Sequence, residues 1–339
     1  MIEGLVYVHD SEPGHRRRRA GKGFCYLTAE GTRICDEVEL FRLRRIGIPP
    51  AWTDVWICRD PCGHLQATGR DARKRKQYLY HPDFREAREG VKFERLPVFG
   101  KHLPRIREMV RRDLALPGLP REKVLATVVH LLEKTLIRIG NEDYARENGS
   151  YGLTTLRQAH VEVERSVLRF DFKGKSGKIW QLRVTDRRIA PIIRRCQELP
   201  GQALFQYRDA DGELHQVTSS DVNAYLAPWG VTAKDFRTWN ATVMMVDLLR
   251  QAPAPKSVAH GKREVVAALK QVGRRLGNTV AVCRRSYVHP AVIDLYMAGK
   301  LDVRYRKDAR SLLAPEERAT LALLRLISEP GNSRDIAPG

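Results

Sequence analysis

Residues 161–184 read VEVERSVLRFDFKGKSGKIWQLRV, and this stretch decides the fold class. Polar and apolar residues alternate on both sides of the turn from Gly174 to Gly177, as they do in a β-hairpin with one buried face. The flanking sequence instead repeats apolar residues every three or four positions, which predicts amphipathic helices. We therefore expect a mainly helical domain that contains a β-hairpin. The expected helices cover 124–139 (with Gly140 as the cap), 187–197, 219–227, 235–250, 262–276, 288–299 and 315–328.

The first 95 residues follow a different pattern, in which short strand-like runs alternate with turn signals such as Asp60-Pro61. The runs lie at 23–27, 54–58 and 76–80. They predict an antiparallel β-rich domain over residues 1–95. A Pro- and Gly-containing stretch at 96–104 predicts a linker, and the C-terminal domain then covers 105–339. The expected fold class is α+β.

Composition narrows the class of function. The chain has 339 residues, and 60 Lys and Arg against 40 Asp and Glu give a net charge of +20. Such a surplus favours a polyanionic partner, of which nucleic acid is the commonest. A hydrophobic content of 42% is too high for a disordered chain. We see neither a spanning segment of about 20 apolar residues nor a signal peptide, so we expect a cytoplasmic, nucleoid-associated protein.

A basic stretch from Arg70 to Lys76 runs into an aromatic one. This mixture suits DNA, because cations meet phosphates and rings meet bases or sugars. An edge strand with lysines that oppose aggregation would look the same. The run from Arg16 to Arg19 is either a further DNA-contacting arm or a disordered charged loop. The candidate DNA-binding residues are Arg70, Arg73, Lys74, Arg75, Lys76, Gln77, Tyr78 and Tyr80.

A zinc site is an alternative for the cysteines at 25, 35, 58 and 62. The spacing Cys58-x-x-x-Cys62 is not the usual C-x2-C, and no pair of histidines supports it. We therefore expect no metal. There is also no G-x-x-x-x-G-K-[ST] loop for a nucleotide, and we expect no cofactor.

Five polar residues stand at positions where a local pattern breaks, and each has an ordinary explanation when it is taken singly. An arginine at a helix end, for example, complements the helix dipole. Together they form a set that phosphoryl transfer needs: two guanidiniums, an ammonium, an amide and a phenol. The set is Arg138, Lys175, Arg237, Asn278 and Tyr287.

The sequence resembles the type IB DNA topoisomerases of the small bacterial and poxvirus kind, from about residue 4 to about residue 329. The resemblance is carried by seven short segments. None of them is specific by itself, but the ordered set is strong evidence. The run Leu276-Gly277-Asn278-Thr279, followed by Cys283-Arg284, looks bacterial rather than viral. The segments are Thr68 to Asp71, Lys76 to Tyr80, Ile137 to Gly140, Tyr151 to Leu156, Phe172 to Lys175, Lys234 to Thr238, and Gly277 to Thr279 with Tyr287.

The resemblance implies a role for each residue of the set. Tyr287 would attack a backbone phosphate and form a 3′-phosphotyrosyl link. Arg138 and Arg237 would bind the non-bridging oxygens, and Lys175 would protonate the leaving 5′-oxygen. Asn278 stands where viral members have histidine, which implies a hydrogen-bond donor to phosphate at that position.

The resemblance also implies a monomeric enzyme whose two domains form a clamp around duplex DNA, with Gln77, Tyr78 and Tyr80 in the major groove. It implies supercoil relaxation without ATP or metal.

Two other readings compete. A tyrosine recombinase or integrase uses similar residues, but such enzymes usually carry H-x-x-R where this chain has Lys234 to Arg237, and they begin with a helical domain. A non-catalytic DNA-binding protein would be expected to have lost at least one residue of the set.

Overall fold

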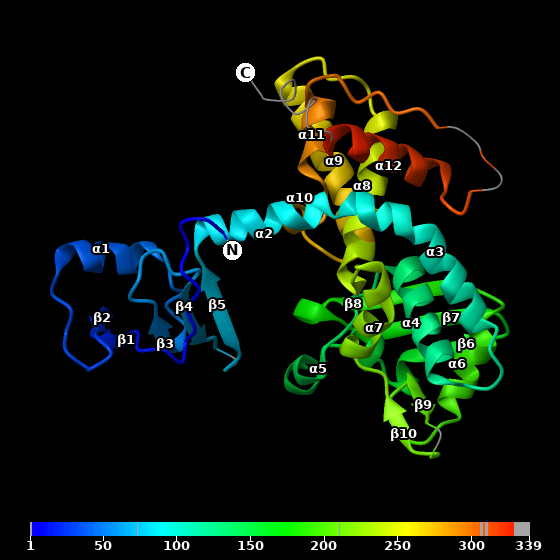
Figure 1. The fold of residues 1–339 in the computed structure, drawn as a ribbon, viewed down its shortest axis with the longest axis horizontal. Helices are drawn as coiled ribbons and strands as arrows, with labels where there is room; N and C mark the ends of the chain where they lie inside the picture. Colours follow the sequence, from blue (N-terminus) through cyan, green and yellow to red (C-terminus); the bar gives the residue numbers. More distant parts are fainter. Residues whose placement is uncertain (1, 73, 210, 306–307, 309–310, 329–339) are drawn as a thin grey trace. The chain divides into compact units, whose positions relative to one another are not determined.

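The computed structural model describes residues 2–72, 74–209, 211–305, 308 and 311–328 (Figure 1). The chain divides into two compact units after Phe93. Within the described residues, no helix combines the length and the apolar character that a membrane span requires. Each unit has its own hydrophobic core, and each is described by itself below.

The first unit is built on a five-stranded antiparallel sheet, which confirms the predicted β-rich N-terminal part. The strands lie in the order β2-β1-β3-β4-β5. Helix α1 (Glu37–Arg45) packs Leu43 against this sheet, and α2 (Pro82–Glu94) follows its last strand. The strand bounds are β1 (His15–Ala20), β2 (Gly23–Leu27), β3 (Thr53–Ile57), β4 (Leu65–Arg70) and β5 (Lys76–Tyr80).

The arginine run from 16 to 19 lies in an ordered strand, β1, so of the two alternatives the disordered loop was wrong. The side chain of Arg17 explains the order. Its guanidinium donates to the carbonyl oxygens of Ile48 at 2.8 Å and Trp52 at 2.9 Å, and it lies 4.1 Å from the centre of the Phe24 ring. One arginine of the run therefore stabilises the unit, while Arg16 and Arg18 are exposed.

The second unit is mainly helical and contains the predicted hairpin. Strands β7 (Val167–Lys173) and β8 (Ile179–Thr185) pair antiparallel up to Lys173 and Ile179, on either side of the glycine turn. Strand β6 (Val161–Glu164) extends this sheet on the β7 side, and β9 (Gln206–Arg208) pairs with β10 (Leu214–Gln216). The helices are α3 (Leu96–Leu114), α4 (Arg121–Thr135), α5 (Glu142–Asn148), α6 (Ile189–Gln197), α7 (Ser219–Leu226), α8 (Ala233–Gln251), α9 (Val258–Leu276), α10 (Val280–Ser286), α11 (Pro290–Met297) and α12 (Pro315–Ser328).

The stretch at 96–104, expected as a linker, is instead the first half of helix α3. Its apolar residues face a core: Phe99 meets Phe236 of α8 edge to face, with 5.0 Å between ring centres. Gly100 is there for close packing, because a Cβ at this position would lie 2.5 Å from the Trp239 ring. The prolines and glycine that indicated a linker are therefore compatible with a buried helix.

Helix α4 is shorter than predicted. It ends at Thr135, and Leu136 caps it in the left-handed conformation with φ of 57°, so Gly140 is not the cap. The periodic apolar residues predicted too long a helix, because Leu136 and Ile137 are buried although they lie beyond its end. Arg138 therefore lies in an irregular segment and not on a helix.

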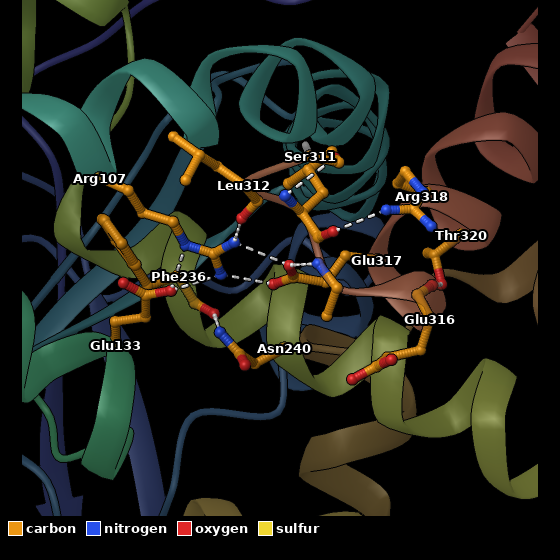
Figure 2. Close-up of polar contacts among 12 residues, drawn as sticks. Arg107, Glu133, Phe236, Asn240, Ser311, Leu312, Glu316, Glu317, Arg318 and Thr320 are labelled. Atoms are coloured by element: carbon orange, nitrogen blue, oxygen red, sulfur yellow. Dashed lines mark hydrogen bonds and ion pairs between the residues drawn. The ribbon is translucent and has the colours of Figure 1, made fainter. Parts of the chain in front are cut away.

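Helix α12 is held to the rest of the second unit by a partly buried arginine. In Figure 2 the guanidinium of Arg107 lies between the carboxylates of Glu133 and Glu317. It also donates to the carbonyl oxygen of Leu312, in the segment before α12. The pKa of Arg107 is raised: burial lowers it, but the two carboxylates outweigh burial. In Figure 1 helices α9, α11 and α12 lie together beside α8.

Candidate active site

The five residues of the predicted chemical set come together in the second unit. Arg138, Lys175, Arg237 and Tyr287 line one cavity of about 400 Å³. Asn278 stands behind this wall, where it contacts both arginines. The residues come from five separate stretches of chain, so the fold alone brings them together.

Arg138 is positioned through its backbone. The N–H of Leu153 donates to the carbonyl of Arg138 at 2.9 Å, and the N–H of Thr154 donates to Ile139 at 2.7 Å. The two segments approach so closely that a Cβ on Gly152 would lie 2.6 Å from the carbonyl oxygen of Arg138. The run Tyr151 to Leu156 therefore serves to hold the segment that carries Arg138.

Arg237 is 3% exposed and lies near the start of helix α8. The helix begins there because the Asp235 carboxylate accepts from the N–H of Thr232 at 2.7 Å, as in a capping box. The Arg237 guanidinium donates to the carbonyl oxygens of Leu136 and, at 2.8 Å, of Leu276. Burial lowers its pKa. Such a group is fixed before any ligand arrives.

Asn278 ties the two arginines together. Its side-chain oxygen accepts from Arg138, and it also accepts from Arg237 at 3.4 Å. Its main-chain N–H donates to Gly273 at 2.9 Å, at the end of α9. Helix α9 thereby fixes the position of the amide.

Two buried donors in this group lack a hydrogen-bond partner among the residues that the structure describes. They are the Nδ2 of Asn278 and the Nε of Arg237. Burial of an unsatisfied donor costs about 1–3 kcal/mol. Both residues also interact with the Tyr287 phenol, and this interaction helps to lower its pKa, so the two groups face the phenol oxygen.

Tyr287 follows helix α10 and is half-buried. The Arg237 guanidinium carbon lies 5.1 Å from the centre of its ring. Burial alone would raise the pKa of the Tyr287 phenol, but the charges of Arg237 and Arg138 outweigh burial and lower it. The site therefore makes the phenolate, which is the nucleophilic form, easier to reach than it is for a free tyrosine.

Lys175 lies at the tip of the β7–β8 hairpin and is exposed. The turn is tight, and Ser176 adopts the left-handed conformation with φ of 64°. The ammonium lies 5.9 Å from the centre of the Tyr144 ring. Lys175 thus reaches the cavity from a different element than the arginines do.

Sequence reasoning missed several wall residues of this cavity. Lys234 belongs to a segment of the resemblance and departs from the recombinase pattern, but it was not a candidate site residue, and it lines the cavity with Arg237. Nothing in the sequence singled out Tyr144 or Ser150, which line it as well. The resemblance included Tyr151 to Leu156, and this segment both lines the cavity and holds Arg138.

The candidate DNA-binding residues belong to the first unit. Strand pairing places Tyr78 opposite Thr68, and Lys76 opposite Arg70. Side chains alternate along a strand, so Lys76, Tyr78 and Tyr80 share one face. The rings of Tyr78 and Tyr80 stack with 6.1 Å between centres. Thr68 is paired in turn with Trp56 of β3, and Trp56 with Arg16 of β1. Because paired residues lie on the same face of a sheet, Arg16 shares the face of Tyr78.

Other members of the candidate set have internal roles. Gln77 lies on the opposite face of β5 and donates to Asp71 at 3.1 Å. Arg75 forms an ion pair with the same carboxylate at 2.6 Å. Lys74 adopts a φ of 60° in the turn, and its carbonyl accepts from Arg70. Arg73 lies outside the described residues.

The zinc alternative finds no support in the described ranges, where no three His, Cys, Asp or Glu side chains form a group that could hold a metal ion. The cavity wall instead offers cationic and amide groups, which suit an anionic ligand.

Comparison with known proteins identifies the class. Residues 81–309 match the catalytic core of eukaryotic DNA topoisomerase I, and residues 23–71 match the N-terminal domain of bacterial DNA topoisomerase IB. The chain therefore belongs to the type IB DNA topoisomerase family, as its sequence pattern indicated.

Relatives cover most of this chain. DNA topoisomerase 1B of Acanthamoeba polyphaga mimivirus is 33% identical over 293 residues, which are 84% of this chain and 87% of that protein. DNA topoisomerase 1B of vaccinia virus (strain Copenhagen) is 23% identical over 270 residues, or 75% of this chain and 80% of that protein. The match to a bacterial-type N-terminal domain agrees with the bacterial character of the Asn278 segment.

Proposed function

We propose that this protein relaxes supercoiled duplex DNA by cutting one strand, letting it swivel and rejoining it. The observation that carries the proposal is the convergence of Arg138, Lys175, Arg237 and Tyr287 on one cavity, with Asn278 in contact with both arginines. A DNA phosphate entering the cavity would meet three cationic side chains beside the Tyr287 hydroxyl.

The cleavage step is a transesterification. The Tyr287 oxygen attacks phosphorus and forms a 3′-phosphotyrosyl bond, while the bond from phosphorus to the 5′-oxygen breaks. Lys175 gives a proton to that leaving oxygen. Rejoining runs the same step backwards, with the 5′-hydroxyl as nucleophile. The phosphotyrosyl bond conserves the energy of the phosphodiester, so the cycle needs no ATP.

Arg138 and Arg237 stabilise the transition state, which gains negative charge on the non-bridging oxygens. Arginine suits this task because its planar fork binds two oxygens at once and does not lose its proton at working pH. Both guanidiniums are held by the protein through Asn278. Preorganised charges of this kind are usually the largest contribution to catalysis, and they supply the positive charge that a metal would otherwise bring.

The outer face of the N-terminal sheet, with Lys76, Tyr78 and Tyr80, is the proposed contact with the DNA groove. Arg70, Arg73, Lys74, Arg75 and Gln77 complete the proposed set. Because β5 is the edge strand of the sheet, a groove wall is within reach of residues on both of its faces. With the catalytic unit on the other side of the duplex, the protein would work as a monomeric clamp on the nucleoid.

The decisive experiment is relaxation of a supercoiled plasmid in EDTA without ATP, with wild type and Tyr287→Phe side by side. Wild type should remove both positive and negative supercoils, and the variant should remove neither. Relaxation by both proteins would show that another residue is the nucleophile. Binding without relaxation by either protein would instead favour the recombinase or the non-catalytic reading.

A further inference from the structure

The indole ring of Trp180 lies between two glycines, and each of these precedes a residue of the chemical set. Gly174 precedes Lys175, and a Cβ there would lie 2.7 Å from Cδ1 and Nε1 of the indole. Gly277 precedes Asn278, and a Cβ there would lie 2.5 Å from Cζ2 of the same ring. The five-membered edge of the indole therefore touches one turn, and its six-membered edge touches the other.

The ring itself is fixed from a third side. Trp180 is 6% exposed and lies on β8, directly opposite Phe172 of β7. The two rings are parallel within 2°, with 6.2 Å between centres. The hairpin turn is closed by the N–H of Gly174, which donates to the carbonyl of Lys178 at 2.7 Å. The indole thus belongs to the rigid part of the hairpin.

The Gly277 turn is rigid as well. Gly277 ends helix α9 with φ of 65°, a conformation that favours glycine, and Asn278 bonds back to that helix. Lys175, by contrast, is exposed at a tip whose next residue is left-handed. The indole therefore links the hairpin tip directly to the Gly277–Asn278 turn.

We propose that Trp180 is a positioning residue that sets the Lys175 ammonium against the phosphate-binding group of Asn278 and the arginines. This inference rests on the proposed function and deepens it. Removal of the indole leaves the hairpin tip without its contact to α9, so the ammonium no longer meets the leaving oxygen at the required distance. A displacement of 1 Å can cost about 10²-fold in rate.

A merely structural role for Trp180 predicts a different outcome when the leaving group changes. An alcohol leaves poorly without a proton, since the pKa of water is about 15.7. A thiol has a pKa of about 8.5 and leaves as the thiolate. A DNA with sulfur in place of the scissile 5′-oxygen therefore dispenses with the general acid, and it rescues only defects in proton donation.

The test measures single-turnover cleavage of two DNA duplexes that differ only in that oxygen or sulfur, at saturating protein. Trp180→Ala should cleave the oxygen substrate about 10–100-fold more slowly than wild type. The sulfur substrate should restore most of the loss, as it should for Lys175→Ala. The double variant should be no slower than Lys175→Ala alone, because both changes remove the same proton transfer.

Three control variants test whether the sulfur substrate rescues only defects in proton donation. Arg237→Ala should stay slow with both substrates, because it acts on the non-bridging oxygens. Phe170→Leu also trims a buried ring of the hairpin, and any loss should be equal for both substrates. Trp180→Phe keeps an aromatic ring and the fold, and it should show a smaller, equally rescued defect if Trp180→Ala proves unstable.

The proposal is overturned if Trp180→Ala and Trp180→Phe slow both substrates equally or slow neither. It also fails if sulfur does not rescue Lys175→Ala, although cleavage by Tyr287 would then still stand. Failure of the proposed function looks different, because wild type would then cleave neither duplex.

Discussion

The hydroxyl of Thr242 donates a hydrogen bond to the carbonyl oxygen of Tyr287, with 3.3 Å between the two oxygens. The same hydroxyl accepts from the N–H of His289 at 3.2 Å. Thr242 is fully buried on α8, five residues after Arg237. One helix therefore carries both a phosphate-binding arginine and the group that fixes the backbone of the nucleophile.

Thr242→Val keeps the shape of the side chain and removes both hydrogen bonds. A hydrogen bond of this kind typically contributes about 0.5–1.5 kcal/mol, so we expect the two together to cost about 1–3 kcal/mol in urea unfolding. Cleavage should slow as well, because the Tyr287 backbone is no longer held. Thr242→Ser retains the hydroxyl and should cleave at nearly the wild-type rate. Equal rates for the valine and serine variants would contradict this role.

Arg138→Ala and Arg237→Ala should each lower the cleavage rate at neutral pH by roughly 10²–10³-fold, the usual cost of removing one fixed electrostatic donor. Single-turnover cleavage measures this directly. DNA binding by both variants should change far less, because many other cations contact phosphate. A loss in binding that equals the loss in rate would mean that the arginines serve affinity and not the transition state.

The pH profile of cleavage should report the charges around Tyr287. Burial raises the pKa of the phenol, but Arg237 and Arg138 bring it below its ordinary value. In wild type the cleavage rate should therefore rise with pH and level off below pH 10. Removing one charge in Arg138→Ala raises that pKa, so the rising limb moves to higher pH. Arg138→Lys keeps the charge and should stay near the wild-type profile; an unmoved limb in the alanine variant would contradict the electrostatic account.

Much of the second unit could be predicted because its elements have clear periods. The hairpin of β7 and β8 and the helices from α6 to α9 follow patterns of two or of about 3.6 residues. Helix α1 was missed, since nine residues with exposed Val38 and Phe41 show no apolar stripe. The linker at 96–104 was wrong because glycine and proline signals do not reveal that Trp239 needs the space at Gly100.

The candidate active site also depends on contacts that local sequence patterns do not reveal. Residue types and their order predicted which five side chains meet, but not how they are held. The bond from Arg138 to Asn278 joins residues 140 positions apart, and no local pattern encodes it. The contact of Trp180 with Gly174 and Gly277 is likewise invisible in a sequence, where Trp180 looks like any inward-facing strand residue.

Gly152→Ala should disturb Arg138 without touching its side chain. The new Cβ would lie 2.6 Å from the carbonyl of Arg138 and from Gly140, both of which are backbone and cannot swing away. We expect cleavage to fall about as far as in Arg138→Ala, with reduced thermal stability. Gly149→Ala is a matched control, because its Cβ would meet nothing within 4 Å. It should cost only about 1 kcal/mol for its positive φ and leave cleavage intact. Normal cleavage by Gly152→Ala would contradict the positioning role of this segment.

Arg107→Ala should destabilise the second unit more than any surface change. Its guanidinium bonds to Glu133 at 2.5 Å and to Glu317 at 2.7 Å, and its loss leaves one partly buried and one buried carboxylate uncompensated. Breaking a fully buried pair costs about 3–5 kcal/mol, so for this partly buried group we expect a loss of up to about that size in urea unfolding. The triple variant Arg107→Met, Glu133→Leu and Glu317→Leu removes all the charges together and should lose much less, since apolar groups of similar size can replace a buried ion group. A loss of the same size in both proteins would mean that the Arg107 stem, and not its charge, holds helix α12 in place.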